Sequence, residues 1–212
     1  QQQQLQQQLM AQNFDVVAVH SAAHDRQQYL LRPDLGRRLD EPSRQRLQAL
    51  AGDARPDIVL VLADGLSALA RLRHGLPLLQ ILRPQLGGWR FAPVVIAEMA
   101  RVALGDEIGE LLHARQLAIM IGERPGLSAP DSLGIYFTHA PAIGRTDAQR
   151  NCISNVRPEG LDYAAAAQRL LQLMHGARHL GRSGIDLNDQ VLGQLALQGA
   201  QLTRSPAPRT PA

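Results

Sequence analysis

Residues 57–75, DIVLVLADGLSALARLRHG, decide the fold of this chain. A continuous run of β-branched residues and leucine ends at Asp64-Gly65, and a helix is expected to open near Ser67. An unbroken apolar run of this length predicts a strand that is buried on both faces. The succession of strand, tight turn and helix is the unit from which parallel α/β sheets are built.

The same pattern recurs on both sides of this stretch. Apolar runs that predict further strands are FDVVAVHS (14–21), APVVIAEMA (92–100), QLAIMIGERPG (116–126) and SLGIYFTHAP (132–141). Helical material is expected in residues 25–50, broken at Pro33 and restarted after Pro42, in residues 105–115, and from Leu161 to about His175 with an end near Gly176. We therefore predict the α/β class, as a mostly parallel sheet flanked by helices in a Rossmann-like single domain.

The ends of the chain differ in composition from its middle. The glutamine tract is too polar to bury a face, so residues 1–13 are expected to form a disordered tail. The α/β domain is placed at residues 14–200. Residues 201–212, rich in proline and serine, are expected to form a loose C-terminal tail.

Composition excludes several classes of function. All 22 basic residues are arginine, so a Schiff-base lysine and a phosphate-loop lysine are both absent. The net charge is +3, but the arginines are scattered and aromatic residues make up only 3%, which argues against nucleic-acid binding. No apolar stretch approaches the roughly 18 residues of a membrane span, so we expect no membrane partner.

The single cysteine, Cys152, cannot form an internal disulfide, which favours a reducing cytoplasmic location. The amino end is typical neither of a secretory signal nor of the amphipathic leader that targets proteins to a bacterial microcompartment. The histidines show no HExxH or other metal-site spacing, and no GxGxxG follows a predicted strand. The sequence therefore predicts no catalytic acid or base constellation and no metal site.

Two predicted loops are candidates for binding, because ligands of open parallel sheets lie beyond the carboxyl ends of the strands. They are ADGLS (63–67) and GERPG (122–126), which we expect at the same edge of the sheet. Asp64 is interpreted first as a turn or helix-capping residue. Glu123 lies in a segment that continues neither strand nor helix, so its carboxylate is presented either to a ligand or to a nearby arginine.

Two further features leave alternatives open. Cys152 is most simply a small buried hydrophobe, since a nucleophilic cysteine would need a histidine base that spacing cannot assign. In RPDLGRRL (32–39), three arginines lie near an acidic residue. They are either solvated charge at a helix end or an anchor for an acidic partner or cofactor group.

Several stretches together resemble the small subunit of ethanolamine ammonia-lyase. They are RPDLGRRL, DIVLVLADGLSA, ARVALGDEIGE, GERPGLS, DSLGIYFT and RTDAQRNCISNVR, which run in the order of that family from about Asp25 to Leu187. In the family an arginine-rich segment precedes this domain, whereas glutamines stand in its place here.

The resemblance implies a hetero-oligomer with a large subunit that converts ethanolamine to acetaldehyde and ammonia with adenosylcobalamin. In the family, cobalamin contacts fall on the Val of RVALGDEIGE, the Glu of GERPG and the Cys of RNCISN, which are Val102, Glu123 and Cys152 here. A lower histidine ligand would need a DxHxxG motif, which is absent, so the cofactor is expected to keep its own base. A bacterial microcompartment is the alternative location that the family suggests.

Two other functions remain open at this point. The chain could be a non-catalytic interaction subunit that stabilises the large subunit with little direct cofactor contact. It could also be a free-standing nucleotide-binding α/β enzyme, although the phosphate-loop glycines are missing. Cofactor retention by the complex separates the first of these from a cobalamin-binding subunit, and ligand binding by the isolated chain tests the second.

Overall fold

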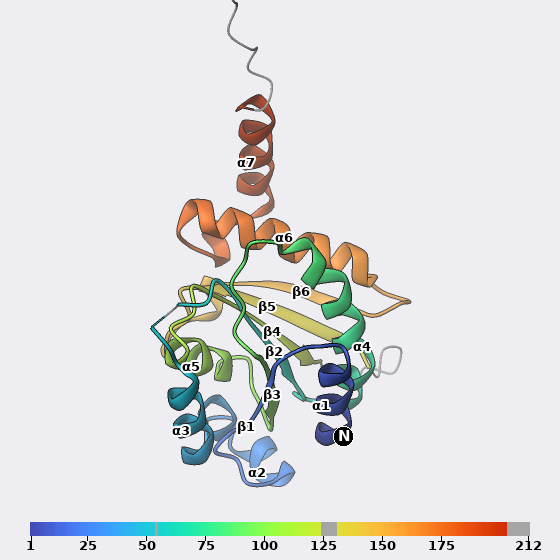
Figure 1. Ribbon diagram of the computed structural model, residues 1–212, viewed down its shortest axis with the longest axis vertical. Helices are drawn as coiled ribbons and strands as arrows, with labels where there is room; N and C mark the ends of the chain where they lie inside the picture. Colours follow the sequence, from blue (N-terminus) through green and yellow to red (C-terminus); the bar gives the residue numbers. More distant parts are fainter. Residues whose placement is uncertain (54, 124–130, 203–212) are drawn as a thin grey trace, which may run out of the picture.

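The computed structural model describes residues 1–53, 55–123 and 131–202 of the chain. Its centre is a six-stranded sheet with the strand order β1-β3-β2-β4-β5-β6 (Figure 1). The strands are β1 (Val16–His20), β2 (Val59–Ala63), β3 (Val94–Glu98), β4 (Gln116–Gly122), β5 (Leu133–His139) and β6 (Arg150–Val156). The first four are parallel, whereas β5 runs antiparallel to β4, and β6 runs antiparallel to β5. The predicted α/β class with a mostly parallel sheet is confirmed.

Helices cover both faces of the sheet (Figure 1). One face packs against α1 (Gln2–Ala11), α4 (Ala68–Leu82) and α6 (Tyr163–Leu180), and the other against α3 (Glu41–Leu50) and α5 (Leu104–Leu111). The remaining helices are α2 (Arg26–Leu31), α7 (Asp189–Leu202), which points away from the sheet beyond α6, and the 3-10 turns η1 (Leu35–Arg37), η2 (Arg83–Gln85), η3 (Asp147–Gln149) and η4 (Gly184–Asp186). Within the described ranges, no helix is both long and apolar enough to cross a membrane.

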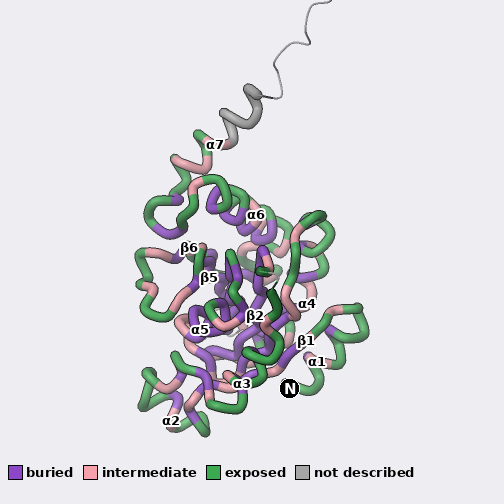
Figure 2. Tube along the Cα trace, turned by 60° about the vertical axis from the view of Figure 1, so that its left-hand side comes forward, coloured by how far each residue is buried: buried purple, intermediate pink, exposed green. Residues whose placement is uncertain are grey.

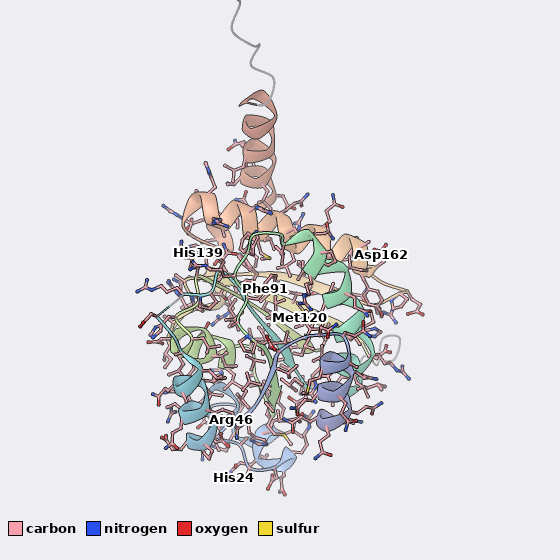
Figure 3. The ribbon with its side chains drawn as sticks, in the orientation of Figure 1. His24, Arg46, Phe91, Met120, His139 and Asp162 are labelled. Atoms are coloured by element: carbon pink, nitrogen blue, oxygen red, sulfur yellow. The ribbon has the colours of Figure 1, made fainter. Side chains whose placement is uncertain are left out.

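The core follows from the apolar strand runs. Every residue of β2 and of β4 is buried, because helices lie on both sides of these central strands (Figure 2). Met120 of β4 lies in the interior on the face that α4 and α6 cover (Figure 3). Burial on both faces is the reason that these strands read as continuous apolar runs rather than alternating ones.

The amino end departs from the expected disordered tail. Residues Gln2–Ala11 form helix α1, and its two leucines, Leu5 and Leu9, are completely buried in the core that α4 also enters. Leucines four residues apart lie on one face of a helix, and two of them suffice to dock a helix whose remaining surface is glutamine. The sequence did not indicate this docking, because the tract as a whole is polar and only two of its residues form the apolar side of the helix.

Two predicted helix boundaries need correction. Helix α3 begins at Glu41 rather than after Pro42, because the Asp40 side chain caps it by accepting from Ser43 N and proline is tolerated in the first turn. Helix α6 continues through Gly176 to Leu180, and Gly181 ends it with φ of 74°. A Cβ at position 176 would lie 2.6 Å from the Leu192 side chain of α7. Glycine at this position of α6 therefore allows α7 to pack closely.

The change to antiparallel pairing at β5 follows from chain length. Only residues 123–132 join β4 to β5. A parallel return requires a crossover of about a dozen residues or more, usually a helix, so the chain turns back beside β4. The predicted C-terminal tail, residues 201–212, begins inside α7, and residues 203–212 lie outside the described part of the chain.

Side-chain contacts fasten helices to the edge strand β1 and to the amino end of the sheet. Arg46 of α3 donates to the Ala18 carbonyl of the edge strand β1, which occupies one of its unpaired backbone groups (Figure 3). Trp89 precedes β3 and packs on α6, where its ring meets His175 edge-on at 5.5 Å and Arg178 lies 5.0 Å from its centroid. This aromatic contact fixes the amino end of the sheet to α6.

Candidate functional site

A cavity lies at the carboxyl edge of the parallel strands, on the α5 side of the sheet. Its lining comes from segments that follow β2, β3 and β4, together with one residue of β5 and one of α2: Tyr29, Gly65, Leu66, Arg101, Val102, Ile121, Gly122, Glu123 and Tyr136. The segments converge because the carboxyl ends of neighbouring parallel strands meet at one edge, the usual ligand position of open α/β sheets.

The two candidate loops are in contact at this edge. Leu66 N donates to the Gly122 carbonyl at 2.9 Å. Gly65 has φ of +56°, and a Cβ there would lie 2.4 Å from the Gly122 oxygen. A Cβ on Gly122 would lie 2.1 Å from the Ser67 oxygen, so both glycines are required for the close approach. The expectation that the loops share one edge is confirmed for Gly122 and Glu123, while residues 124–130 lie outside the described chain.

Asp64 organises this edge from inside the protein. Its buried carboxylate accepts hydrogen bonds from Gly65 N at 2.8 Å, Met99 N at 2.9 Å and Ala100 N at 3.0 Å. Met99 has a positive φ of 53°, which is unfavourable for a residue with a side chain, and the hydrogen bonds from Asp64 stabilise this turn. Asp64 is therefore a turn residue, as first interpreted. Helix α4 is capped instead by Ser67, which accepts from Ala70 N.

Glu123 lines the cavity and is anchored through one of its two carboxylate oxygens. Oε2 accepts from Ser132 Oγ at 2.7 Å and from Asn155 N at 3.2 Å. Within the described part of the chain, Oε1 has no hydrogen-bond donor, and a Cβ on Gly134 would lie only 2.8 Å from it. The glycine thus makes room for the carboxylate. Glu123 is held by β5 and β6 through one oxygen and retains the other as a free acceptor.

Val102 supplies an apolar wall. It is half-buried, follows β3 and directly precedes Ala103, the N-cap of α5. It packs against the core on the α5 side of the sheet while it lines the cavity. Together with Ile121 it gives the cavity an apolar surface between its polar groups.

Cys152 is exposed, so its interpretation as a buried core residue is wrong. The thiol lies on β6, where Ile153 points into the α6-side core and Cys152 therefore points to the opposite face. The described core on the α5 side contains no residue of β6, and this face of the strand is exposed at Cys152 and Ser154. The Cys152 Sγ lies 3.2 Å from Ser154 Oγ.

Tyr136 joins the candidate residues. It lies opposite Cys152 in the β5–β6 pairing and lines the cavity with Val102 and Glu123. Burial raises the pKa of Tyr136 to about 12, and the neighbouring Cys152 thiol and Glu123 carboxylate add to the shift. Val102 and Glu123 thus share one cavity, whereas Cys152 is not part of its lining and adjoins it through Tyr136.

The wall formed by α5 is fixed to β6 by a buried ion pair. Arg150 donates to both Asp106 oxygens, at 2.6 and 2.7 Å, and both side chains are almost completely buried. Asp106 is in the first turn of α5, close behind Val102, and Arg150 is two residues before Cys152 on the same face of β6. The pair therefore sets the position of α5 relative to the strand that carries the thiol.

The RPDLGRRL arginines Arg32 and Arg38 make ion pairs within this chain, and nearby Arg44 of α3 joins Arg38. Arg32 pairs with Asp34 on the surface, at 2.7 Å, as solvated charge. Arg38 and Arg44 both bind the buried carboxylate of Glu107, at 3.0 and 2.9 Å. This cluster joins the η1 segment and α3 to α5, so its role here is internal.

Sequence reasoning missed three lining residues: Tyr29, Arg101 and Tyr136. Tyr29 is completely buried beside the Arg101 side chain, and its hydroxyl donates to Ala100 O at 3.0 Å. Of these three, only Tyr136 could have been found from the sequence, because it carries a hydroxyl group within the otherwise apolar run GIYF. In the structure it is the partly exposed residue of that run. The other two are brought to the site by contacts between distant segments.

The fold and the cavity define an α/β domain with a candidate site at its sheet edge that combines an apolar wall with a few polar groups. Comparison with known proteins specifies the family. A family model described as ethanolamine ammonia-lyase light chain (EutC) matches residues 1–188, and the chain belongs to this family.

Relatives described as ethanolamine ammonia-lyase small subunit agree with this assignment. The one from Pseudomonas aeruginosa (strain UCBPP-PA14) is 57% identical over 200 residues, which cover 92% of this chain and 71% of the relative. The one from Ralstonia nicotianae is 58% identical over 191 residues, or 87% and 70% of the two chains. The one from Azotobacter vinelandii is 56% identical over 191 residues, or 88% and 70%. The resemblance noted in the sequence is confirmed.

Proposed function

We propose that this chain is the small subunit of an adenosylcobalamin-dependent ethanolamine ammonia-lyase, which converts ethanolamine to acetaldehyde and ammonia. It completes the cobalamin site at the interface with the large catalytic subunit and contributes no catalytic residue of its own. The proposal is supported by the family and by the cavity at the sheet edge. It places the chain in the cytoplasm, with a bacterial microcompartment as the alternative.

The cavity fits part of a cobalamin molecule. Corrin is a broad apolar disc with amide side chains at its rim, so it requires an apolar wall and a few hydrogen-bond acceptors. Val102 and Ile121 provide the wall, and Glu123 Oε1 is an acceptor without a donor among the described residues. The cavity volume of about 400 Å³ suits a drug-sized ligand and is too small for the whole cofactor. The large subunit must therefore cover the rest.

Each proposed contact has a distinct part in holding the cofactor. Val102 packs against the ring, and Glu123 accepts hydrogens from rim amides. Cys152, exposed on β6, is small enough to lie against the rim without adding charge. When bound, adenosylcobalamin supplies the radical chemistry of the reaction. Its lower base stays its own, since the chain lacks a DxHxxG motif.

The observation that carries the proposal is the pairing of a free carboxylate oxygen with an apolar wall in one cavity, in a chain of this family. Its test is reconstitution with a cognate large subunit. We expect the complex to retain adenosylcobalamin through gel filtration and to release acetaldehyde from ethanolamine, and the isolated chain to show neither property.

The same experiment separates the competing functions. A complex that is active but loses no cofactor affinity when Val102, Glu123 and Cys152 are replaced together identifies an interaction subunit with little direct cofactor contact. Turnover by the isolated chain would contradict the assignment of the chemistry to the large subunit.

A further inference from the structure

Arg101 is a firmly held guanidinium in the wall of the cavity. Its Cζ lies 4.3 Å from the centroid of the Tyr29 ring, and its Nη2 donates to the Tyr29 carbonyl at 3.1 Å. Gly36 gives the side chain room, because a Cβ there would lie 2.8 Å from the Arg101 Cγ. Stacking, a hydrogen bond and close packing together fix the position of a group that is flexible on most protein surfaces.

This guanidinium lacks a counter-ion. Among the described residues, no carboxylate lies within ion-pair distance of Arg101. Asp64 is the carboxylate near Tyr29, but its oxygens accept from backbone N–H groups. The buried Nε of Arg101 has no hydrogen-bond partner. A half-buried, desolvated charge of this kind is costly unless another molecule pairs with it.

Arg26 adds a second positive charge to the same place. Its Cζ lies 4.7 Å from the Tyr29 ring centroid, and it donates to Gly65 O at 2.7 Å and to Leu66 O at 3.2 Å. Both acceptors belong to residues that line the cavity. Arg26 also has no carboxylate within ion-pair distance among the described residues. The two guanidiniums therefore make one end of the cavity positive.

The positive end and the Glu123 carboxylate lie apart along the sheet edge. Arg101 follows β3 and Glu123 follows β4, with β2 between these strands. Two strand spacings separate the segments by about 10 Å. The same cavity therefore has the Glu123 carboxylate, a hydrogen-bond acceptor for amides, at one side. At the other side it has the Arg101 guanidinium, which can pair with an anion.

We infer that Arg101, with Arg26 beside it, forms an anion subsite for a phosphodiester group of the bound ligand. The inference rests on the proposed cobalamin function, in which the phosphodiester of the nucleotide loop is the anionic group of the cofactor. A guanidinium pairs with phosphate oxygens through two parallel N–H donors, and such charge-assisted bonds are stronger than neutral ones. The subsite would orient the nucleotide loop while Val102 and Glu123 engage the ring.

The test compares cyanocobalamin with dicyanocobinamide, which lacks the phosphodiester, in binding titrations of the assembled two-subunit complex. Arg101→Gln should raise the Kd for cyanocobalamin at least about tenfold and leave that for dicyanocobinamide unchanged. Arg83→Gln is the matched control. Arg83 also stacks on a ring, 4.6 Å from the Phe14 centroid, and donates to a carbonyl, Asn13 O at 2.9 Å, but lies outside the cavity. It should change neither Kd.

A second measurement does not depend on any variant. Because an ion pair at a partly open site is screened by salt, added NaCl should weaken cyanocobalamin binding more than dicyanocobinamide binding by the unsubstituted complex. Equal salt dependence, or an equal loss of both ligands in Arg101→Gln, would overturn the inference. So would an Arg101→Gln complex that assembles only at higher subunit concentration but, once assembled, binds both ligands normally, since Arg101 would then pair with the large subunit. A wild-type complex that binds neither ligand would refute the proposed function itself, and the subsite with it.

Discussion

The two carboxylate oxygens of Glu123 differ in their hydrogen bonding. Oε2 is bound to Ser132 and to the Asn155 amide, so it connects the end of β4 to β5 and β6. Oε1 faces the cavity without a donor from the described residues. A side chain that is anchored through one atom and free at the other is positioned before its ligand arrives, which reduces the entropic cost of binding.

Replacement of Glu123 by alanine should weaken cobalamin binding to the assembled complex by about 1–3 kcal/mol, the usual cost of an unsatisfied polar partner. Titration of cyanocobalamin into the complex measures the change. Glu110→Ala serves as the control, because Glu110 also accepts a backbone amide, Ile143 N at 2.7 Å, but lies outside the cavity lining. Equal dissociation constants for the wild type and Glu123→Ala would remove Glu123 from the site.

Tyr136 gives the fold a dependence on alkaline pH. The pKa of its hydroxyl is raised by burial, and further by Cys152 and Glu123, to about 12. The folded state therefore keeps a proton that the unfolded state begins to lose near about pH 10. Between these two pH values the folded state binds more protons, so its stability must fall as the pH rises.

Tyr136→Phe should remove this contribution. The free energy of unfolding, measured with denaturant at about pH 9 and about pH 11, should fall less steeply for the variant than for the wild type. The pKa values of Tyr29 and Tyr163 are also raised by burial, so a residual decline is expected in both proteins. Parallel decline in the two proteins would show that the Tyr136 hydroxyl titrates at its ordinary pKa.

At the scale of elements, the pair Asp106–Arg150 is the strongest link between α5 and β6. Two hydrogen bonds join the side chains, and the exposed fraction is 3% for Asp106 and 4% for Arg150. Arg150 also donates to the Arg145 carbonyl at 2.7 Å and lies 3.5 Å from the exposed carboxylate of Asp147, while its buried Nε has no hydrogen-bond partner among the described residues. Loss of Asp106 removes the two hydrogen bonds of the buried pair and leaves the Arg150 guanidinium without its closest carboxylate.

Asp106→Ala should therefore destabilise the isolated chain by about 3–5 kcal/mol in denaturant unfolding. The exposed pair Arg32–Asp34 provides the control, and Asp34→Ala should change the stability far less, because solvent screens an exposed ion pair. The double variant Asp106→Leu with Arg150→Met should recover much of the loss, because it leaves no unpaired charge. A single variant as stable as the wild type would mean that water reaches the pair.

The elements also show how far sequence reasoning extends. Strands β2 and β4 were predictable because burial on both faces requires unbroken apolar runs. The burial of α1 was not, because only Leu5 and Leu9 mark its apolar side among glutamines. The antiparallel pairing of β5 and β6 follows from connections that are short for a parallel crossover, which depends on exact strand ends and not on the apolar runs alone.

At the scale of the whole molecule, the candidate site is a product of the topology. Val102, Glu123 and Tyr136 follow or belong to three different strands and meet only when the sheet is complete. The rule that ligands lie beyond parallel strands led to the prediction that the two loops share an edge, which the contact between Leu66 and Gly122 confirms for the described residues. It could not predict Arg101 or Tyr29, because their positions depend on the fit of the Gly36 segment against Arg101.

Trp89, the sole tryptophan, lies at the end of the sheet opposite the cavity, where its ring meets His175 and Arg178 of α6. The wavelength of its emission therefore reports whether α6 is packed at that end, and does not depend on direct contact with the contents of the cavity. Unfolding should shift the emission maximum to longer wavelength, as the indole enters water. A coloured ligand in the cavity should instead dim the emission by energy transfer and leave its wavelength unchanged. One optical signal from the native protein thus distinguishes loss of structure from occupancy.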